Sequence, residues 1–265
     1  MSEFAAGPAG RIERVRALMA ERGYDAIVVR DEANLRWLTG VKGVFDYTFE
    51  FPHAAFITAD QCLFHTDSRY LNSFEENTPA GSPWVYDMDE GTIPGWVAGK
   101  IAANKCRVCA VEDDMQINFY QGIQRGLEDR SVACILPLMH DDIRKMRAIK
   151  DAEEIELMRH AQSITDAAFQ HMLGFIKPGM TEKQVRNELE NFMFANGADS
   201  LAFGSIVASG PNTANPHAVP SDRVIEKGDF VLMDYGAGYC DYRSDMTRTV
   251  VMLSLIHISE PTRRS

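Results

Sequence analysis

The side chains best suited to chemistry lie between residues 209 and 249. Asp234 belongs to a run, residues 230–235, whose apolar residues predict a strand. An unpaired carboxylate among apolar side chains is energetically unfavourable, so Asp234 needs a partner. Asp245 directly precedes a second predicted strand, residues 246–252. The linking residues are long enough for a hairpin, which would bring the two carboxylates together.

Two interpretations of this carboxylate pair are open. Two ionised carboxylates at short range repel each other unless a cation lies between them. One or two divalent ions would remove the repulsion, because carboxylate oxygens suit Mg and Mn and, with imidazole added, Zn, Co or Fe. Alternatively, Asp234 is neutralised by Arg243 or Arg248 in a buried ion pair, and Asp245 is a turn residue.

His217 is a third candidate. It follows Pro216 in a stretch rich in Pro, Gly, Ser and Asn, which predicts a loop before the strand that carries Asp234. A neutral imidazole near a metal site could donate a hydrogen bond to a substrate carbonyl or stabilise charge that develops on it. A histidine on a loop is also often simply solvated.

The first half of the chain alternates helix and strand patterns, which predicts an α/β domain over residues 1–142. Apolar residues recur at helical spacing over residues 12–19, and Gly23 can end that helix. Two apolar runs separated by two residues predict a hairpin over residues 54–65. The other expected strands are residues 25–29, 84–86, 107–111 and 132–136, and the other helices are residues 93–103 and 117–127.

The second half predicts an α+β domain over residues 143–252, because helical patterns precede strand patterns. A charged helical stretch covers residues 141–175. A second helix begins at Thr181, where Thr181 and Gln184 have the capping-box spacing, and ends before Gly197. Strands are expected at residues 203–208, 230–235 and 247–252. On the first helix, one face should carry Ile155, Met158, Ala161, Thr165, Ala168 and Met172.

The composition is that of an ordinary soluble protein, with 265 residues, 45% hydrophobic residues and 25% charged residues. A net charge of −11 argues against nucleic acid or an anionic membrane surface as a partner. The sequence contains neither a long apolar span nor a secretory signal, so we expect a cytoplasmic protein. Of the five cysteines, Cys106 and Cys109 alone have motif spacing, and their apolar neighbours predict core residues rather than a metal or redox site.

Several phrases together resemble the creatinase, prolidase and aminopeptidase P family of the pita-bread fold, to which methionine aminopeptidases also belong. The resemblance covers almost everything up to Met252. In the first half its phrases are Asn34-Leu-Arg-Trp-Leu-Thr-Gly40 and Thr66-Asp-Ser-Arg-Tyr70. In the second half they are Arg147-Ala-Ile-Lys-Asp-Ala-Glu-Glu-Ile-Glu156, Lys177-Pro-Gly-Met-Thr-Glu182, Ser209-Gly-Pro-Asn212, Pro216-His217, Lys227-Gly-Asp229, Met233-Asp-Tyr-Gly-Ala237 and Ser244-Asp-Met-Thr-Arg-Thr249.

This resemblance implies a creatinase-like N-terminal domain, a pita-bread catalytic domain and a dinuclear metallo-exopeptidase. Asp234 and Asp245 match two of the five metal ligands of the family, and His217 matches its substrate-side histidine. Two Mn, Co or Zn ions would acidify a bridging water to hydroxide, which attacks the peptide bond before proline. The implied protein is an Xaa-Pro peptidase of the aminopeptidase P or prolidase type, a homodimer that acts on short proline-containing peptides.

The chain also departs from the family pattern. The other family ligands, a histidine and two glutamates, lie well beyond the second aspartate, where this chain has only residues 246–252 before its last segment. Residues 253–265 resemble the translation of a transposase adapter used in sequencing libraries, so we expect a non-native tail and assign no ligand role to its His257. We therefore expect a C-terminally truncated product with an incomplete metal site and little or no activity.

The truncation has a predicted structural effect, and two other functions remain open. The strands at residues 230–235 and 247–252 would have an unpaired sheet edge and an uncovered apolar face, so the second domain should fold poorly or aggregate. A metal-free creatinase-type amidinohydrolase would keep the fold but has no need of both aspartates. A non-catalytic peptide-binding module would use the same cleft without chemistry. Metal analysis separates the peptidase from both alternatives.

Overall fold

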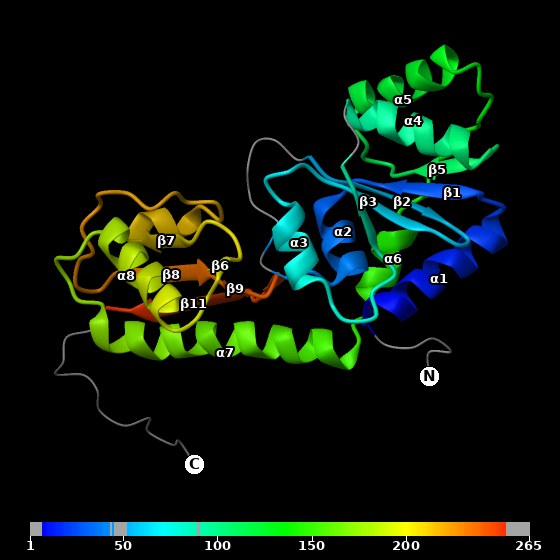
Figure 1. The fold of residues 1–265 in the computed structure, drawn as a ribbon. Helices are drawn as coiled ribbons and strands as arrows, with labels where there is room; N and C mark the ends of the chain where they lie inside the picture. The colour runs from blue at the N-terminus through cyan, green and yellow to red at the C-terminus, as the bar shows by residue number, and fades with distance from the viewer. Residues whose placement is uncertain (1–6, 43, 45–51, 89–90, 253–265) are drawn as a thin grey trace. The chain divides into compact units, whose positions relative to one another are not determined.

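The computed structural model describes residues 7–42, 44, 52–88 and 91–252 and divides into two compact units (Figure 1). Unit 1 comprises residues 1–151 and unit 2 residues 152–265. The sequence predicts the boundary after residue 142. The structural boundary lies later because helix α6 (Asp142–Ala148) belongs to unit 1, where Ile143 is part of the hydrophobic core. The predicted non-native tail and its His257 lie outside the described residues.

The predicted single helix over residues 141–175 is wrong, because the chain forms two helices there. Helix α6 ends at Ala148, and Ile149 has an extended backbone with φ −99° and ψ 106°. Helix α7 (Ala152–Phe175) begins only after Asp151, whose carboxylate accepts a 3.0 Å hydrogen bond from Arg11 Nη2. Residues 149–151 therefore separate two helices where the sequence predicts one, and the boundary between the two units follows directly after them.

Unit 1 is built on a five-stranded mixed sheet with the order β4-β3-β2-β1-β5. The strands β2 (Ala54–Thr58) and β3 (Cys62–His65) form the predicted antiparallel hairpin. The strand predicted at residues 132–136 is wrong, because only isolated bridges such as Val108 to Ile135 form there. The remaining strands are β1 (Ala26–Val29), β4 (Val85–Asp87) and β5 (Cys109–Val111).

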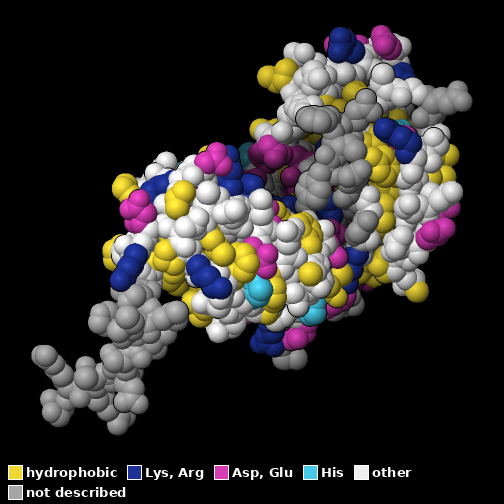
Figure 2. All heavy atoms as spheres, turned by 90° about the vertical axis from the view of Figure 1, so that its left-hand side faces the viewer, with side chains coloured by type: hydrophobic (Ala, Val, Ile, Leu, Met, Phe, Trp, Pro, Cys, Tyr) yellow, Lys and Arg dark blue, Asp and Glu magenta, His cyan; other side chains and the backbone are white. Residues whose placement is uncertain are grey.

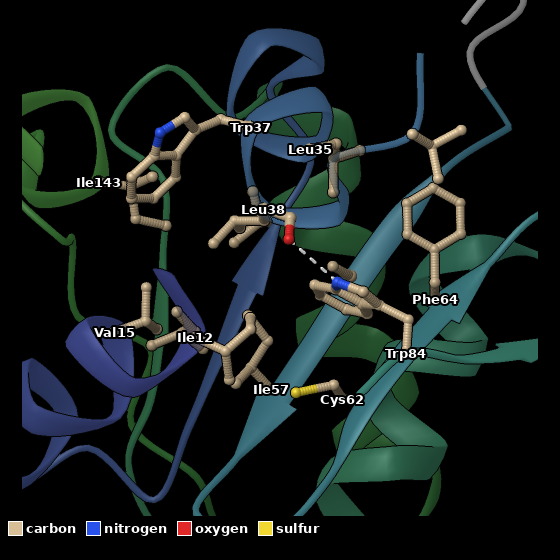
Figure 3. Packing of buried hydrophobic residues seen from close by; sticks show 14 of the residues in the cluster. Ile12, Val15, Leu35, Trp37, Leu38, Ile57, Cys62, Phe64, Trp84 and Ile143 are labelled. Atoms are coloured by element: carbon tan, nitrogen blue, oxygen red, sulfur yellow. Dashed lines mark hydrogen bonds between the residues drawn. The ribbon is translucent and has the colours of Figure 1, made fainter. Parts of the chain in front are cut away.

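Helices cover both faces of this sheet, which explains why β1 and β2 are buried along their whole length. One face packs against α1 (Gly7–Arg22), α2 (Glu32–Thr39), α3 (Leu71–Asn77) and α6. The other packs against α4 (Ile93–Ala103) and α5 (Ile117–Asp129). Figure 3 shows the first core, in which Trp84 Nε1 donates a 3.1 Å hydrogen bond to the Leu38 carbonyl.

The interpretation of Cys106 and Cys109 as core residues agrees with their environment. They are 3% and 0% exposed and belong to the hydrophobic cluster beneath α4 and α5. Burial raises the pKa of the Cys106 thiol to about 11, so this thiol is neutral and poorly nucleophilic at neutral pH.

Unit 2 contains two helices on one face of a three-stranded antiparallel sheet (Figure 1). The sheet has the order β11-β8-β7, with β7 (Ile206–Ser209), β8 (Phe230–Tyr235) and β11 (Met246–Val251). The helices are α7 and α8 (Glu182–Ala195), and α8 begins with the predicted capping box of Thr181 and Gln184. A second small sheet contains β6 (Ser200–Leu201), β9 (Ala237–Tyr239) and β10 (Tyr242–Arg243), and the 3-10 helix η1 spans Gly210–Ala214.

The two faces of the β11-β8-β7 sheet differ in their environment. Val231, Met233 and Tyr235 alternate toward α7 and α8 and are fully buried. On the other face Phe230 is 55% and Val251 40% exposed, and β11 is an outer strand among the described residues. The expected unpaired edge is therefore found for β11 within the described residues but not for β8, which pairs with both β7 and β11, and the face of Phe230 also carries the polar residues Asp234 and Thr247. Poor folding or aggregation stays a prediction, for which near-UV circular dichroism and dye binding are the measurements.

Ile155 and Met158, expected on the buried face of α7, are 40% and 37% exposed, whereas the later positions of that face are buried. No helix within the described residues is both long and apolar enough to cross a membrane.

Candidate metal and substrate site

The two aspartates lie on one face of one antiparallel strand pair. In the register of β8 and β11, Asp234 is opposite Thr247, and Tyr235 is opposite Met246. The Ser244 N–H donates to the Ala237 carbonyl at 3.0 Å, so the same register continues through Asp245. Because side chains alternate along a strand, Asp245 and Thr247 share the face of Asp234. Diagonal neighbours of this kind lie about 7–8 Å apart.

A tight connection sets this register. Cys240 and Asp241 have φ values of 46° and 70°, the pair of positive φ angles that a type I′ hairpin requires. A Cβ added to Gly236 would lie 2.0 Å from the Ser244 carbonyl oxygen, so the two strands approach too closely there for any larger residue. The Ser244 hydroxyl lies 2.6 Å from Thr165 Oγ1 and thereby ties the connection to α7.

The contacts of Asp234 argue against the ion-pair interpretation. Its Oδ1 accepts a 2.9 Å hydrogen bond from Thr247 Oγ1, and the carboxylate is half-buried. Arg248 alternates to the opposite face, where its guanidinium lies 5.9 Å from the centre of the Phe169 ring. Arg243 Nη1 donates to the Ala202 carbonyl at 2.8 Å. Asp245 is exposed just before β11, where it can act as a ligand without loss of core packing.

These two carboxylates fit part of a divalent metal site. Their oxygen donors suit hard cations, and their shared face lets one or two ions lie between them. Among residues 7–42, 44, 52–88 and 91–252, no group of three or more His, Cys, Asp and Glu side chains is arranged to hold a metal ion. The described part of the chain therefore contains two candidate ligands and no complete metal site.

His217 lies on the predicted loop, between η1 and β8, and is exposed. Its backbone N–H donates to Asn215 Oδ1 at 3.1 Å. Its neighbours Ala218 and Pro220 are buried, so the loop is anchored on one side of the histidine while the imidazole remains accessible. No hydrogen bond within the described residues joins His217 to either aspartate, so the structure does not bring the three residues into direct contact.

Glu182 is a buried charged residue to which the sequence analysis assigns no role. It is the first residue of α8, is fully buried and accepts five hydrogen bonds from Ser209, Asn212 and Ser221. Burial works against its ionisation, but the hydrogen bonds from Ser221, Asn212 and Ser209 outweigh burial and lower the pKa of Glu182 below its ordinary value. Its place directly after the capping Thr181 indicates the start of a helix, but no local pattern in the sequence indicates these contacts.

The face of the molecule drawn in Figure 2 has mixed charge. Figure 2 shows Lys and Arg side chains in several separate places on the face in view, with Asp, Glu and hydrophobic side chains between them. The described residues of this face therefore carry charges of both signs.

Family models match both halves of the chain. The creatinase/prolidase N-terminal domain matches residues 11–149, and metallopeptidase family M24 matches residues 156–262. The second match extends into the predicted non-native tail, so the predicted domain end at Met252 stays a prediction.

Individual relatives agree with these models. The uncharacterized peptidase YqhT of Bacillus subtilis is 34% identical over 249 residues, covering 91% of this chain and 65% of that protein. The Xaa-Pro dipeptidase of Pyrococcus furiosus is 45% identical over 112 residues, covering 42% of this chain and 32% of that protein.

The solved structure of the Xaa-Pro dipeptidase from Bacillus anthracis superimposes with a TM-score of 0.81 at 34% identity and covers 94% of this chain and 66% of that one. The chain thus spans about two thirds or less of the length of these relatives. The domain matches and this superposition confirm the fold class inferred from the sequence phrases. The chain belongs to the creatinase and prolidase group of metallopeptidase family M24, with a creatinase N-terminal domain followed by an M24 pita-bread domain.

Proposed function

We propose that the intact protein containing this sequence is a metal-dependent Xaa-Pro peptidase of the aminopeptidase P or prolidase type. The observation that carries this proposal is the placement of Asp234 and Asp245 on one face of one strand pair, beside an open sheet face. The similarity to a Pyrococcus furiosus protein named Xaa-Pro dipeptidase supports the choice of substrate class. Short proline-containing peptides, a cytoplasmic location and a homodimer are parts of the same proposal.

Each residue of the site has a defined task. Asp234 and Asp245 would supply carboxylate oxygens to Mn, Co or Zn, and the Thr247 hydroxyl orients Asp234 by donating to its Oδ1. When bound, the divalent ions supply acidified water and polarisation of the peptide carbonyl. The exposed imidazole of His217 donates a hydrogen bond to the substrate on the loop side and stabilises negative charge that develops there.

For the 265-residue chain itself we propose weak metal binding and little or no peptidase activity. The described residues contribute two ligands, and a pair of partly exposed carboxylates holds a divalent ion weakly.

Equilibrium dialysis against Mn²⁺ tests the assignment of the two ligands. We expect weak binding by the unmodified chain and at least about tenfold weaker binding after Asp234→Asn or Asp245→Asn, because each substitution removes a charged ligand. Asp222→Asn is the matched control, since the Asp222 side chain is 82% exposed and pairs with Lys183. Equal Mn²⁺ binding by all four chains contradicts the assignment, and substantial cleavage of Xaa-Pro dipeptides by the Mn²⁺-loaded chain contradicts the proposed inactivity.

A further inference from the structure

The connection between β7 and β8 carries His217 on a loop whose two ends meet at one buried carboxylate. Ser209 begins this loop and Ser221 ends it, and both residues contact Glu182. Compact surface loops with adjacent ends often hold functional groups. We call residues 209–221 the His217 loop.

Each oxygen of Glu182 serves one end of the His217 loop. Oε1 accepts hydrogen bonds from the Ser209 N–H at 2.7 Å, the Ser209 hydroxyl at 2.9 Å and Asn212 Nδ2 at 3.0 Å. Oε2 accepts from the Ser221 N–H at 3.0 Å and the Ser221 hydroxyl at 2.6 Å. The loop is therefore closed by a single side chain of another element.

A second set of contacts reinforces the start of the loop. Arg223 Nη1 donates to Ser209 Oγ at 2.6 Å and to Asp229 Oδ2 at 2.7 Å. Gly210 has φ +51°, and an added Cβ would lie 2.5 Å from Arg223 Nη2. The guanidinium thus occupies the space that a side chain at residue 210 would need, and the loop begins in a direction that is fixed by packing.

Glu182 itself is held in place by the start of α8. Thr181 Oγ1 accepts from the Gln184 N–H at 3.2 Å, and Gln184 Oε1 accepts from the Thr181 N–H at 2.8 Å, so the capping box is complete on both sides. The Glu182 N–H donates to the Arg223 carbonyl at 3.2 Å. The carboxylate therefore projects from a rigid helix start.

We propose that Glu182 is a positioning residue, whose buried carboxylate fixes both ends of the His217 loop and thereby holds the imidazole of His217 at the substrate side of the site. The proposal deepens the peptidase function proposed above and rests on it for the role of His217. The fixation of the loop is a separate claim that can be measured on this chain without metal or substrate.

The test is amide hydrogen exchange, read by mass spectrometry, on the full chain and on Glu182→Gln. A glutamine side chain keeps one acceptor oxygen and replaces the other with an NH2 group, which cannot accept a hydrogen bond. The donors at one end of the loop would then face this NH2 group without an acceptor, so that end is released. We expect exchange of the Ser209 and Ser221 amides and of the amides between them to accelerate about ten- to a hundredfold. Amides within β8 and β11 should keep their protection. The imidazole signals of His217 in NMR spectra should shift toward those of an unstructured peptide.

The matched control is Glu190→Gln on the same helix, where Glu190 Oε2 lies 3.8 Å from Arg186 Nε, one turn earlier on α8. It should leave the loop and the His217 signals unchanged. Ser221→Ala removes only one donor, so it keeps the test possible if Glu182→Gln does not fold, and we expect a smaller acceleration confined to the far end of the loop. Unchanged exchange in the loop, or an increase spread evenly over unit 2, overturns the proposal.

Failure of this proposal is distinguishable from failure of the proposed function. If the unmodified chain binds no Mn²⁺ while Glu182→Gln still releases the loop, the assignment of Asp234 and Asp245 as ligands, on which the proposed function rests, fails and the fixation of the loop stands. If Mn²⁺ binding depends on both aspartates while the loop is unaffected by Glu182→Gln, the positioning role fails alone.

Discussion

Unit 1 and unit 2 each contain a buried glutamate that joins distant segments, and the two glutamates have opposite pKa shifts. Glu112 is 5% exposed and accepts hydrogen bonds from Arg30 N at 2.5 Å, Asp31 N at 2.7 Å and Asn34 Nδ2 at 2.7 Å. Glu182 is 0% exposed and accepts five hydrogen bonds. Similar burial thus coexists with different numbers of donors.

The charge state follows the balance between burial and donors. Burial raises the pKa of Glu112 to about 7, although the hydrogen bonds from Asn34, Arg30 and Asp31 favour the charged form, and the Asp31 carboxylate adds to the rise. Burial opposes ionisation of Glu182 too, but its hydrogen bonds, including those from Ser221 and Asn212, prevail and lower the pKa. Whether each carboxylate is charged therefore depends on the balance between the cost of removing it from solvent, which dominates at Glu112, and the hydrogen bonds that stabilise the charge, which prevail at Glu182.

The largest expected difference between the units is in the pH dependence of stability. The folded pKa of Glu112 is about 7 and its ordinary value 4.5, so between these values the folded state holds a proton that the unfolded state has released. The free energy of unfolding of unit 1 should therefore fall by about 3 kcal/mol as pH rises from 4.5 to 7 and then level off. Denaturant titrations followed by tryptophan fluorescence measure this, because Trp37, Trp84 and Trp96 all lie in unit 1.

Two variants check which group causes this dependence of the free energy of unfolding on pH. Glu112→Gln should abolish it, because the amide does not titrate in this range. Glu128→Gln, at an exposed position of the same unit, should retain it. An unchanged pH dependence in Glu112→Gln would show that another group titrates.

For unit 2 the pH dependence of stability has the opposite sign. The lowered pKa of Glu182 gives stability that is present above its ordinary value of 4.5 and lost as pH falls below it.

Removal of one of the three donors to Glu112 should have an intermediate effect. Asn34→Ala deletes the side chain that donates to Glu112 Oε1 and accepts from Arg147 Nη1 at 2.8 Å. We expect unit 1 to lose about 2 kcal/mol and the pKa of Glu112 to rise further, because burial is then opposed by fewer hydrogen bonds. Tryptophan-detected unfolding at several pH values measures both effects. A pKa that stays the same would contradict the comparison.

Removal of one of the five donors to Glu182 should have the smallest effect. Ser221→Ala deletes the hydroxyl that donates at 2.6 Å but keeps the Ser221 N–H, which also donates to Oε2. We expect the free energy of local opening at the far end of the His217 loop to fall by about 1 kcal/mol and the pKa of Glu182 to move upward toward its ordinary value. Hydrogen exchange of the loop amides reports the opening, with the amides of β8 as the unchanged reference, and the pH at which the His217 loop loses protection reports the pKa. A loss larger than that of Asn34→Ala would reverse the proposed ranking.

The sequence predicts most of the features that depend on neighbouring residues. The capping box at Thr181, the hairpin over residues 54–65 and the strand at residues 230–235 all have local signals, and the structure contains each of them. The shared face of Asp234 and Asp245 follows from the predicted hairpin because alternation along strands is regular. The family phrases add the candidate ligands Asp234 and Asp245, whose metal binding stays a prediction.

The features that the sequence does not reveal depend on short elements or distant partners. Helices α2 and α3 have only eight and seven residues, too few for a clear periodicity. The strand expected at residues 132–136 lacks a continuous partner, and its Ile135 is 68% exposed. Glu182 contacts residues 27 and 39 positions later in the chain, and no local pattern announces such a contact.

The closure of the His217 loop by Glu182 also has a consequence for the order of folding. The capping box needs only residues three positions apart, so the start of α8 can form early. Closing the loop requires Ser209 and Ser221 to reach a carboxylate that is already in place, and such long-range contacts form slowly because the intervening chain must first lose entropy. We therefore expect the His217 loop to be among the last parts of unit 2 to become ordered during refolding, after the helix that holds it.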